Sequence, residues 1–361
     1  MLSIVPLKNA EAAKSYYEKD NYYVKNSPEA IEASHWYGKG AKMLGLSGYV
    51  ELEKFEPLLE GKLPNGVQLG RIAGGKIKHR PGYDLTFSAS KSFSILCEIG
   101  RDKRLLKAHD KAVEEALNYI QSNAIKTRVS KDGEIAFEKA DNIIAALFRH
   151  DTSRELDPNT HTHCVVINAV KRADGKWRSI SSEAIFDLKM TAGMVYRAKL
   201  AKLVRKLGYD IEIMHADGRF EIKGISEEMT EGFSKRRQEI EKMLQEKGWE
   251  GGKASATVSQ ETRRKKQDVD RKLLYQTWQE EAKQYDINLE SVIKKAVERT
   301  PIIEQNATRS RFNIAKKSVE YALNHLSETE SVFGEHEIIK ESLAFGMGKI
   351  ILKDVKKAIA Y

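Results

Sequence analysis

Three histidines in one short stretch limit most strongly what this chain can fold into. His150 ends the run NIIAALFRH at 142–150, and His161 and His163 open the run HTHCVVINAV at 161–170. Both runs have strand length and the polar segment DTSRELDPNT joins them, so we expect two strands that pair as an antiparallel hairpin. Because side chains alternate across a strand, His161 and His163 share one face. The sequence therefore predicts a site of three imidazoles with positions left open for water or substrate.

A metal ion is the ligand that this site would hold. An isolated His-x-His pair is more often two unrelated polar side chains, but the third histidine and the strand context favour metal binding here. A cation held only by neutral imidazoles keeps nearly its full positive charge. Such a cation is suited to bind a phosphate oxygen and to stabilise the charge that develops during attack at phosphorus.

The attacking group is expected among four tyrosines near the start of the chain, where residues 10–25 predict a short helix and a turn. They form two pairs, Tyr16 with Tyr17 and Tyr22 with Tyr23. A phenol with a pKa of about 10 needs a nearby cation or base to become a nucleophile. We expect Tyr16 to act first and Tyr22 or Tyr23 to act second. The alternative, that these rings pack the helix into the core, is expected for two of the four.

A carboxylate is expected beside the histidines. The segment GYDLTFS at 82–88 alternates in character like a strand and places Asp84, Thr86 and Ser88 on one polar face. Asp84 there can orient a metal-bound histidine or accept the tyrosine proton. A purely structural aspartate is the alternative.

Charge and composition indicate the class of partner. The chain has 61 Lys+Arg against 52 Asp+Glu, a formal charge of +9, which favours a polyanion such as nucleic acid. Cys97 and Cys164 lie far apart and lack the spacing of a disulfide framework or a zinc site, so a reducing cytoplasm is expected. No segment is long and apolar enough to predict membrane insertion or an ordinary cleaved secretion signal.

The rest of the chain predicts mostly helices. Between them, residues 36–48 predict a loop that leads into short helical turns, and residues 251–271, which are basic and poor in apolar residues, predict a segment that is mobile without DNA. The expected helices cover residues 104–125, 188–207, 234–247 and 306–326.

Three motifs resemble a known family when they are taken in order. They are YYxxxxYY near the start, HRPGYDLTFSASKS at 79–92 and FRHDTSRELDPNTHTHCVVINAV at 148–170. Together they are similar to the two-tyrosine, F-plasmid-type conjugative relaxases (MobF class), which belong to the HUH endonucleases. The resemblance runs from residue 1 to about residue 300.

The resemblance implies an α+β fold: an antiparallel, about five-stranded sheet forms a palm that helices flank, and a helical C-terminal part clamps DNA. It implies a catalytic core at 1–233 and a basic, helical clamping segment at 234–300. Residues 301–361 are expected to be a helical linker towards a downstream, helicase-like region. The chain itself contains no GxxxxGK[ST] phosphate loop.

The resemblance also implies the chemistry. Relaxases of this kind nick one strand at a plasmid transfer origin, form a 5′-phosphotyrosine and a free 3′-hydroxyl, and rejoin the ends after transfer. One Mg²⁺ or Mn²⁺ ion serves the reaction. The implied site residues are the nucleophile Tyr16, the cluster partners Tyr17, Tyr22 and Tyr23, the carboxylate Asp84, and the metal ligands His150, His161 and His163.

Two positions depart from the family pattern. Thr162 stands between the paired histidines, where the group's name denotes a bulky apolar residue. Ser90 stands where relatives commonly have proline. Threonine is a good strand former, so the strand geometry is expected to hold.

DNA contacts are expected from basic side chains around the site. Lys91 can meet a phosphate together with the amides of a helix start. Arg80 and Arg154 flank the catalytic strands, and Arg197 matches a family helix position near bound DNA. The cluster expected to follow the DNA backbone comprises Arg236, Arg237, Arg263, Arg264, Lys265 and Lys266.

The implied setting is the cytoplasm of a donor bacterium, with transfer of the protein together with the DNA into the recipient. The expected partners are single-stranded DNA of a transfer origin, relaxosome accessory proteins and the coupling protein of a type IV secretion system. One alternative is a rolling-circle replication initiator, against which the sequence HRPGYDLTFS at 79–88 argues. The others are a non-catalytic single-stranded DNA-binding module and a three-histidine metallohydrolase without a covalent intermediate.

Overall fold

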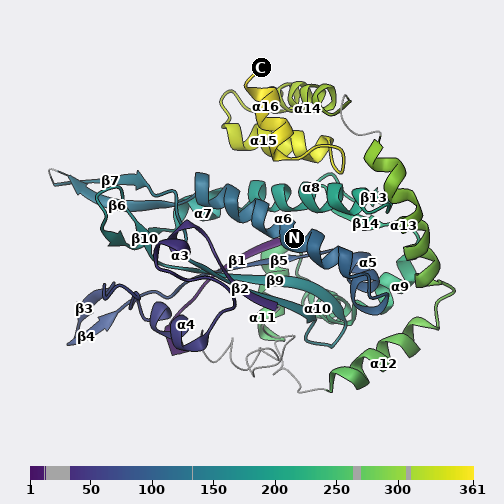
Figure 1. Cartoon of the computed structure of the whole chain (residues 1–361), viewed down its shortest axis with the longest axis horizontal. Coiled ribbons are helices and arrows are strands. Elements are labelled where there is room, and N and C mark those ends of the chain that lie inside the picture. Colours follow the sequence, from purple (N-terminus) through teal and green to yellow (C-terminus); the bar gives the residue numbers. More distant parts are fainter. Residues whose placement is uncertain (12, 14–32, 132, 263–269, 306–309) are drawn as a thin grey trace.

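The computed structural model describes residues 1–11, 13, 33–131, 133–262, 270–305 and 310–361 (Figure 1). Several predicted site residues therefore lie outside the described residues. They are Tyr16, Tyr17, Tyr22, Tyr23, Arg263, Arg264, Lys265 and Lys266, together with most of the helix expected at 10–25.

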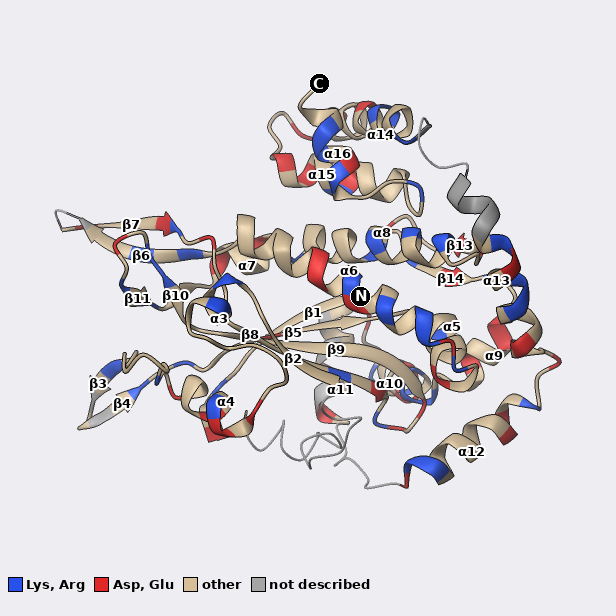
Figure 2. Cartoon of the chain, viewed as in Figure 1, with Lys and Arg blue, Asp and Glu red and all other residues tan. Residues whose placement is uncertain are grey.

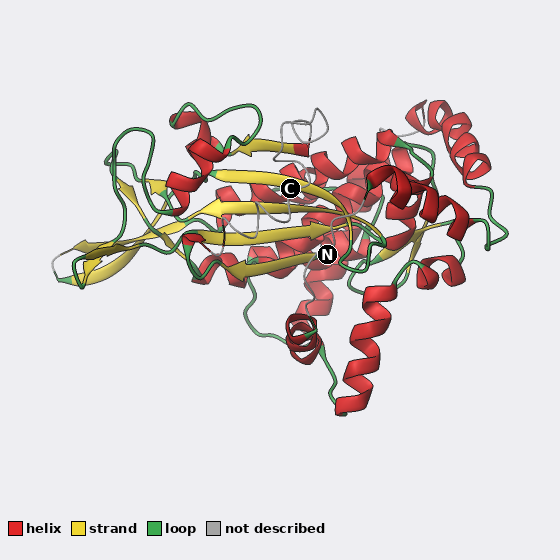
Figure 3. Cartoon of the chain, turned by 90° about the horizontal axis from the view of Figure 1, so that it is seen from below, coloured by secondary structure: helices red, strands yellow, loops and turns green. Residues whose placement is uncertain are grey.

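A five-stranded antiparallel sheet forms the centre of the molecule, which confirms the expected α+β fold (Figure 3). The two histidine-bearing strands pair with each other, as expected. The edge strand β2 includes Trp36, where the sequence predicted a loop. In sheet order, the strands are β1 (Leu2–Pro6), β5 (Gly82–Ser88), β9 (Pro158–Ile167), β8 (Ala145–Thr152) and β2 (Ser34–Tyr37).

One face of this sheet packs against two long helices, α6 (Lys103–Asn123) and α8 (Lys189–Lys206). Leu85 and Phe87 of β5 are completely buried in this core. The apolar face predicted for α6 is buried as well, since Leu105, Ala108, Ala112 and Ala116 all point into the same core. Burial of these side chains anchors the sheet on its helical layer.

The opposite face has an apolar half and a polar half. Phe148 and Val165 share a core with Trp36 of β2 and Phe55 of α4 (Leu52–Leu59). Strand alternation places the histidines on this same face, because Phe148 pairs with His163 across the β8–β9 ladder. The functional side chains therefore lie beside a packed apolar cluster that holds the strands in place.

Small β-elements extend one end of the sheet, and the sequence analysis did not anticipate them. Figure 1 shows the ribbons β3–β4 and β6–β7 projecting from the same end. The elements are β3 (Arg71–Ala73), β4 (Lys76–Lys78), β6 (Lys126–Lys131), β7 (Glu134–Lys139), β10 (Val170–Lys171), β11 (Trp177–Arg178) and β12 (Ile180–Ser181), with β13 (Ile211–Ile213) and β14 (Phe220–Ile222) further along the chain.

The remaining described elements are mainly helices, among them those expected at 234–247 and 306–326. They are α3 (Lys39–Met43), α5 (Lys91–Ser94), the π-helix η1 (Ile95–Ile99), α7 (Glu183–Asp187), α9 (Glu227–Gly232), α10 (Lys235–Lys247), α11 (Gly252–Glu261), α12 (Arg271–Ala282), α13 (Leu289–Gln305), α14 (Ser310–Ser327), α15 (Glu335–Phe345) and α16 (Leu352–Ile359). None of the described helices combines the length and apolar character needed to cross a bilayer.

The segment 251–271, predicted to be mobile without DNA, includes the helix α11. Val258 of this helix is completely buried, and Arg236 of α10 donates to the Ser259 carbonyl at 2.9 Å. Packing against α10 thus stabilises a helix whose own composition is a weak signal.

The domain boundary predicted at residue 300 stays a prediction. Helix α13 runs across it, and α14, α15 and α16 follow as a group of helices that pack on one another. Thr191 of α8 donates to the His336 carbonyl at 3.1 Å, which joins this group to the core.

Gly82 provides a test of the sheet. It opens β5 with φ +151°, and an added Cβ would lie 2.0 Å from the Val166 carbonyl oxygen. Gly66 has φ +82° but open space around it. Gly66→Ala should cost about 1 kcal/mol of unfolding free energy through its backbone alone. Gly82→Ala should cost about 1–3 kcal/mol more because the ladder must shift. Urea unfolding measures both, and equal losses would contradict this close approach.

Candidate metal centre

The three predicted histidines meet on one face of the β8–β9 hairpin. His150 pairs directly with His161, and the three ring centroids lie 5.1–5.2 Å apart. One ring nitrogen or other ligand atom from each residue lies within 4.8 Å of the others, close enough to share one ion. All three side chains are nearly buried, with exposed fractions of 4%, 9% and 7% for His150, His161 and His163.

Hydrogen bonds fix the orientation of two of these rings. His163 Nδ1 lies 2.7 Å from Asp84 Oδ2, and the Thr86 hydroxyl lies 3.0 Å from the same nitrogen. His161 Nδ1 lies 2.7 Å from the carbonyl oxygen of Asn159. A carboxylate and a carbonyl accept, so each Nδ1 carries the proton and each Nε2 is left with its lone pair. This is the arrangement in which a second layer of residues orients metal-binding imidazoles.

The donor set fits a divalent cation that keeps open positions. Three imidazole nitrogens with no anionic ligand among the described residues resemble catalytic three-ligand sites, in which water or substrate completes the coordination. Asp84 lies behind His163 rather than among the ligands, which favours its predicted orienting role. Asn159 was missed by the sequence analysis, although its position two residues before His161 places it on the same face of the strand.

A buried polar chain supports the histidine strand from the other face of the sheet. His109 of α6 is fully buried, with Nε2 at 2.9 Å from the Thr162 hydroxyl and Nδ1 at 2.9 Å from the Tyr196 hydroxyl. The hydroxyl that distinguishes Thr162 from a bulky apolar residue is therefore paired. Because Thr162 stands between His161 and His163, this chain links the metal-facing strand to α6 and α8.

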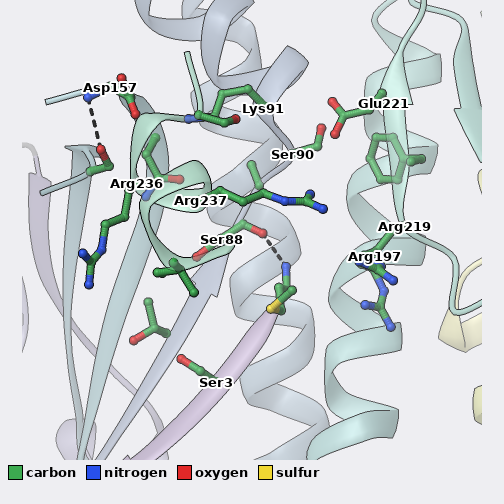
Figure 4. A pocket seen from close by; sticks show the side chains of 18 of the residues that line it. Ser3, Ser88, Ser90, Lys91, Asp157, Arg197, Arg219, Glu221, Arg236 and Arg237 are labelled. Atoms are coloured by element: carbon green, nitrogen blue, oxygen red, sulfur yellow. Dashed lines mark hydrogen bonds between the residues drawn. The ribbon is translucent and has the colours of Figure 1, made fainter. Parts of the chain in front are cut away.

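Figure 4 shows a cavity of about 580 Å³ that adjoins the histidines. Thr86 and Asn159, the hydrogen-bond partners of His163 and His161, contribute to its wall. Helices α10 and α11 supply part of its lining through Arg237, Ile240 and Ser255. Its cationic side chains are Lys91, Arg197, Arg219, Arg236 and Arg237, and its acidic ones are Asp157, Glu221 and Glu241. The cavity is thus a partly basic cleft between the sheet and the α10–α11 pair.

Arg197 and Arg219 form one cationic end of this cleft (Figure 4). Arg197 is only 8% exposed, and burial together with the charge of Arg219 lowers its pKa. The two guanidinium groups repel each other, and Asp217, whose Oδ2 lies 3.0 Å from Arg219 Nε, offsets part of that repulsion. A bound anion would relieve the rest.

The surroundings of Lys91 differ from the expectation. Its Nζ donates to the Pro158 carbonyl at 2.9 Å, and burial lowers its pKa to about 8. The amide of Ser92, expected to help bind a phosphate, instead donates to Glu221 at 2.9 Å. Lys91 thus faces the cleft as a half-buried cation. The Glu221 carboxylate already occupies the start of its helix, α5.

The other predicted DNA contacts are spread over two surfaces. Arg154 is half-buried in the turn between β8 and β9. Arg80 lines a second hollow of about 960 Å³ beside the β3–β4 ribbon, near which Figure 2 shows a concentration of Lys and Arg. The described lining of this hollow contains no Asp or Glu. Its other Lys and Arg residues are Lys8, Arg71, Lys78 and Arg178.

Arg236, which was predicted to follow the DNA backbone, donates to the carbonyls of Ser259 and Thr262 and so connects α10 to α11.

The comparisons with known proteins agree with this architecture. The TrwC relaxase family model matches residues 10–285. The multifunctional conjugation protein TraI of Escherichia coli (strain K12) is 33% identical over 98% of this chain. The chain spans 21% of the length of that relative.

The matches to solved structures of conjugative relaxase TrwC cover 80% of this chain and 100% of each TrwC chain. The copper-bound complex with oriT DNA is 36% identical, with a TM-score of 0.72. The complex with a 27-mer DNA comprising the recognition hairpin and the cleavage site is 35% identical, with a TM-score of 0.71.

The buried His109 predicts a pH dependence of stability. Burial lowers its pKa to about 3, whereas the unfolded side chain titrates near 6.5. Between these values the unfolded state binds a proton that the folded state does not, so stability falls as pH falls, by up to about 1.4 kcal/mol per pH unit. His109→Gln should remove this contribution from unfolding curves measured between pH 4 and 7. The exposed His325→Gln serves as the control, and an unchanged slope in His109→Gln would contradict the assignment.

Proposed function

This chain belongs to the TrwC relaxase family, and from that premise we propose that it nicks and rejoins one DNA strand at a plasmid transfer origin. The observation that carries the proposal is the three-histidine cluster, in which Asp84 orients His163, beside a partly basic cleft. The reaction is a transesterification, in which a tyrosine replaces the 3′ oxygen at phosphorus and the reverse step restores the strand.

We propose that His150, His161 and His163 bind one divalent cation, Mg²⁺ or Mn²⁺. A solved complex of the relative TrwC with oriT DNA is metal-bound. The bound ion would withdraw charge from a non-bridging oxygen of the scissile phosphate. The Asp84 carboxylate would hold the Nδ1 proton of His163, keeping its Nε2 directed at the ion, and the Asn159 carbonyl would do the same for His161.

Tyr16 is proposed as the first nucleophile. Its phenolic oxygen forms a bond to phosphorus, the bond from phosphorus to the 3′ oxygen breaks, and the 3′ oxygen takes up a proton. The products are a 5′-phosphotyrosine and a free 3′-hydroxyl. We assign Tyr17, Tyr22 and Tyr23 to the same cluster, with Tyr22 or Tyr23 acting in a second transfer.

The single strand is proposed to run through the cleft between the sheet and the α10–α11 pair. Arg197, Arg219 and Lys91 would neutralise its phosphates, with Arg154 contributing from the β8–β9 turn. The segment 234–300, which contains both helices of the pair, would close over the strand as a clamp. Arg263 and Arg264, which lie outside the described residues, would add to the positive charge of this segment.

The second hollow, whose described lining contains no Asp or Glu, is proposed to bind further phosphates of the same DNA. Arg80, Arg71 and Lys78 line it together with Arg178 of β11. The relative TrwC was solved with a DNA that comprises a recognition hairpin as well as the cleavage site. A second basic surface allows one protein to hold both parts of such a DNA.

The cellular setting follows from the family. We propose action in the cytoplasm of a donor bacterium, with relaxosome accessory proteins, recruitment by a type IV coupling protein, and passage into the recipient with the DNA. The relative TraI is much longer than this chain, which spans 21% of its length.

The covalent step can be tested with a labelled origin oligonucleotide. The protein, Mg²⁺ or Mn²⁺ and the oligonucleotide are incubated and then denatured on a gel. A shifted covalent band is expected, and it should disappear in Tyr16→Phe while the exposed Tyr321→Phe control retains it. Cleavage products without any adduct would instead indicate a hydrolase, and binding without cleavage a non-catalytic module.

The metal centre can be tested separately from DNA binding. His161→Ala should slow nicking by about 10²–10³-fold because the charge stabilisation at phosphorus is lost. Its affinity for the oligonucleotide should change by less than about twofold, since basic side chains supply most of that affinity. His325→Ala is the control, and a parallel loss of binding and nicking in His161→Ala would contradict this division.

A further inference from the structure

The turn that joins the two histidine strands has an unfavourable backbone conformation. Leu156 adopts φ +61°, in the left-handed region that disfavours side chains other than glycine. The β8–β9 ladder also shifts its register between His150 and Thr152. Within the turn, the Ser153 amide donates to the Asp157 carbonyl at 2.8 Å. A strained turn of this kind persists only where its surroundings hold it.

Helix α12 supplies that support from outside the sheet. The indole Nε1 of Trp278 donates to the Leu156 carbonyl at 2.7 Å, and Trp278 is only 6% exposed. Trp278 and Leu274 belong to an apolar cluster with Ile95, and the Leu156 side chain packs against that cluster. The left-handed residue is therefore held both by its carbonyl and by its side chain.

Further contacts tie both ends of α12 to the same turn. At its start, Arg271 forms an ion pair with Asp151, the residue after His150. Near its end, Glu281 Oε1 lies 2.7 Å from Lys235 Nζ, which lies 3.7 Å from Asp157 Oδ1. Helix α12 thus contacts Asp151 and Leu156 directly and is linked to Asp157 through Lys235 of α10.

We propose that Trp278 is a positioning residue that holds this turn and thereby fixes His150 relative to His161. The part of this proposal that concerns the metal site rests on the proposed function. Trp278 touches neither DNA nor ion; it acts through the Leu156 carbonyl and the hairpin. Because α12 lies within the proposed clamp segment, docking of that segment against the hairpin also aligns the histidines.

Two measurements on the DNA-free chain test the proposal. Trp278→Phe keeps an aromatic ring but removes the donor to Leu156, and Thr277→Ala is the matched control, because Thr277 is exposed and its hydroxyl bonds only within α12. Hydrogen–deuterium exchange reports the turn at 151–160, and electron paramagnetic resonance titration reports Mn²⁺ affinity. Trp278→Phe should speed exchange in the turn several-fold and weaken Mn²⁺ binding about tenfold. Thr277→Ala should change neither.

A second variant separates strain from general loosening of the helix. Leu156→Gly removes the penalty for the left-handed conformation. In that background, Trp278→Phe should weaken Mn²⁺ binding by less than about twofold, a coupling that a double-mutant cycle measures. If Trp278→Phe does not fold, Arg271→Gln removes the ion pair with Asp151 and tests the support of the same hairpin from the start of α12, with smaller effects expected.

The outcomes are distinct. Unchanged exchange in Trp278→Phe overturns the support of the turn. Faster exchange with unchanged Mn²⁺ affinity, or an equal loss of affinity in the Leu156→Gly background, overturns the link to the histidines. A wild-type chain that binds no Mn²⁺ would refute the proposed metal centre, while the exchange result would still decide whether Trp278 holds the turn.

Discussion

The antiparallel pairing of β8 with β9 is the constraint on which the rest of the structure depends. It places His150 directly opposite His161, and strand alternation adds His163 to the same face. A shift of the ladder by one residue would send one strand's histidine side chains to the opposite face. The apolar cluster around Phe148 and Val165 resists such a shift, because these side chains occupy the same face as the histidines and a shift would take one of them out of the cluster.

The chemistry around this pairing is built in layers. Asp84 and the Asn159 carbonyl lie behind the rings and settle which nitrogen carries the proton. His109 and Thr162 support the strand from the opposite face. Since the carboxylate accepts from a histidine, it leaves the charge of a bound ion undiminished by direct coordination, which suits an ion whose task is to polarise a phosphate.

Local signals predicted the centre of the fold well. The alternation at 82–88 predicted β5 and the shared face of Asp84 and Thr86, and the spacing of the histidines predicted their convergence. These features depend on neighbours in sequence or on a hairpin, where periodicity is informative. The amphipathic pattern of α6 and the helical pattern of α8 were equally clear.

Features built from distant segments were not predictable. The edge strand β2 lies in a segment that was predicted to be a loop. The helix α11 lies in a segment predicted to be mobile, and its packing on α10 could not be seen in the sequence. Arg219 enters the cleft from a short ribbon, and Trp278 reaches the histidine hairpin across 122 positions of sequence. Such contacts arise from tertiary packing, which one-dimensional patterns do not encode.

The most direct test of the account is to count the nitrogens around a bound ion. Protein with ¹⁵N-labelled histidine is loaded with Mn²⁺ without DNA, and electron spin echo spectroscopy detects the directly coordinated imidazoles. The account predicts coupling to three histidine nitrogens, reduced to two in His150→Ala. Coupling to none or to one in the wild-type protein would contradict it.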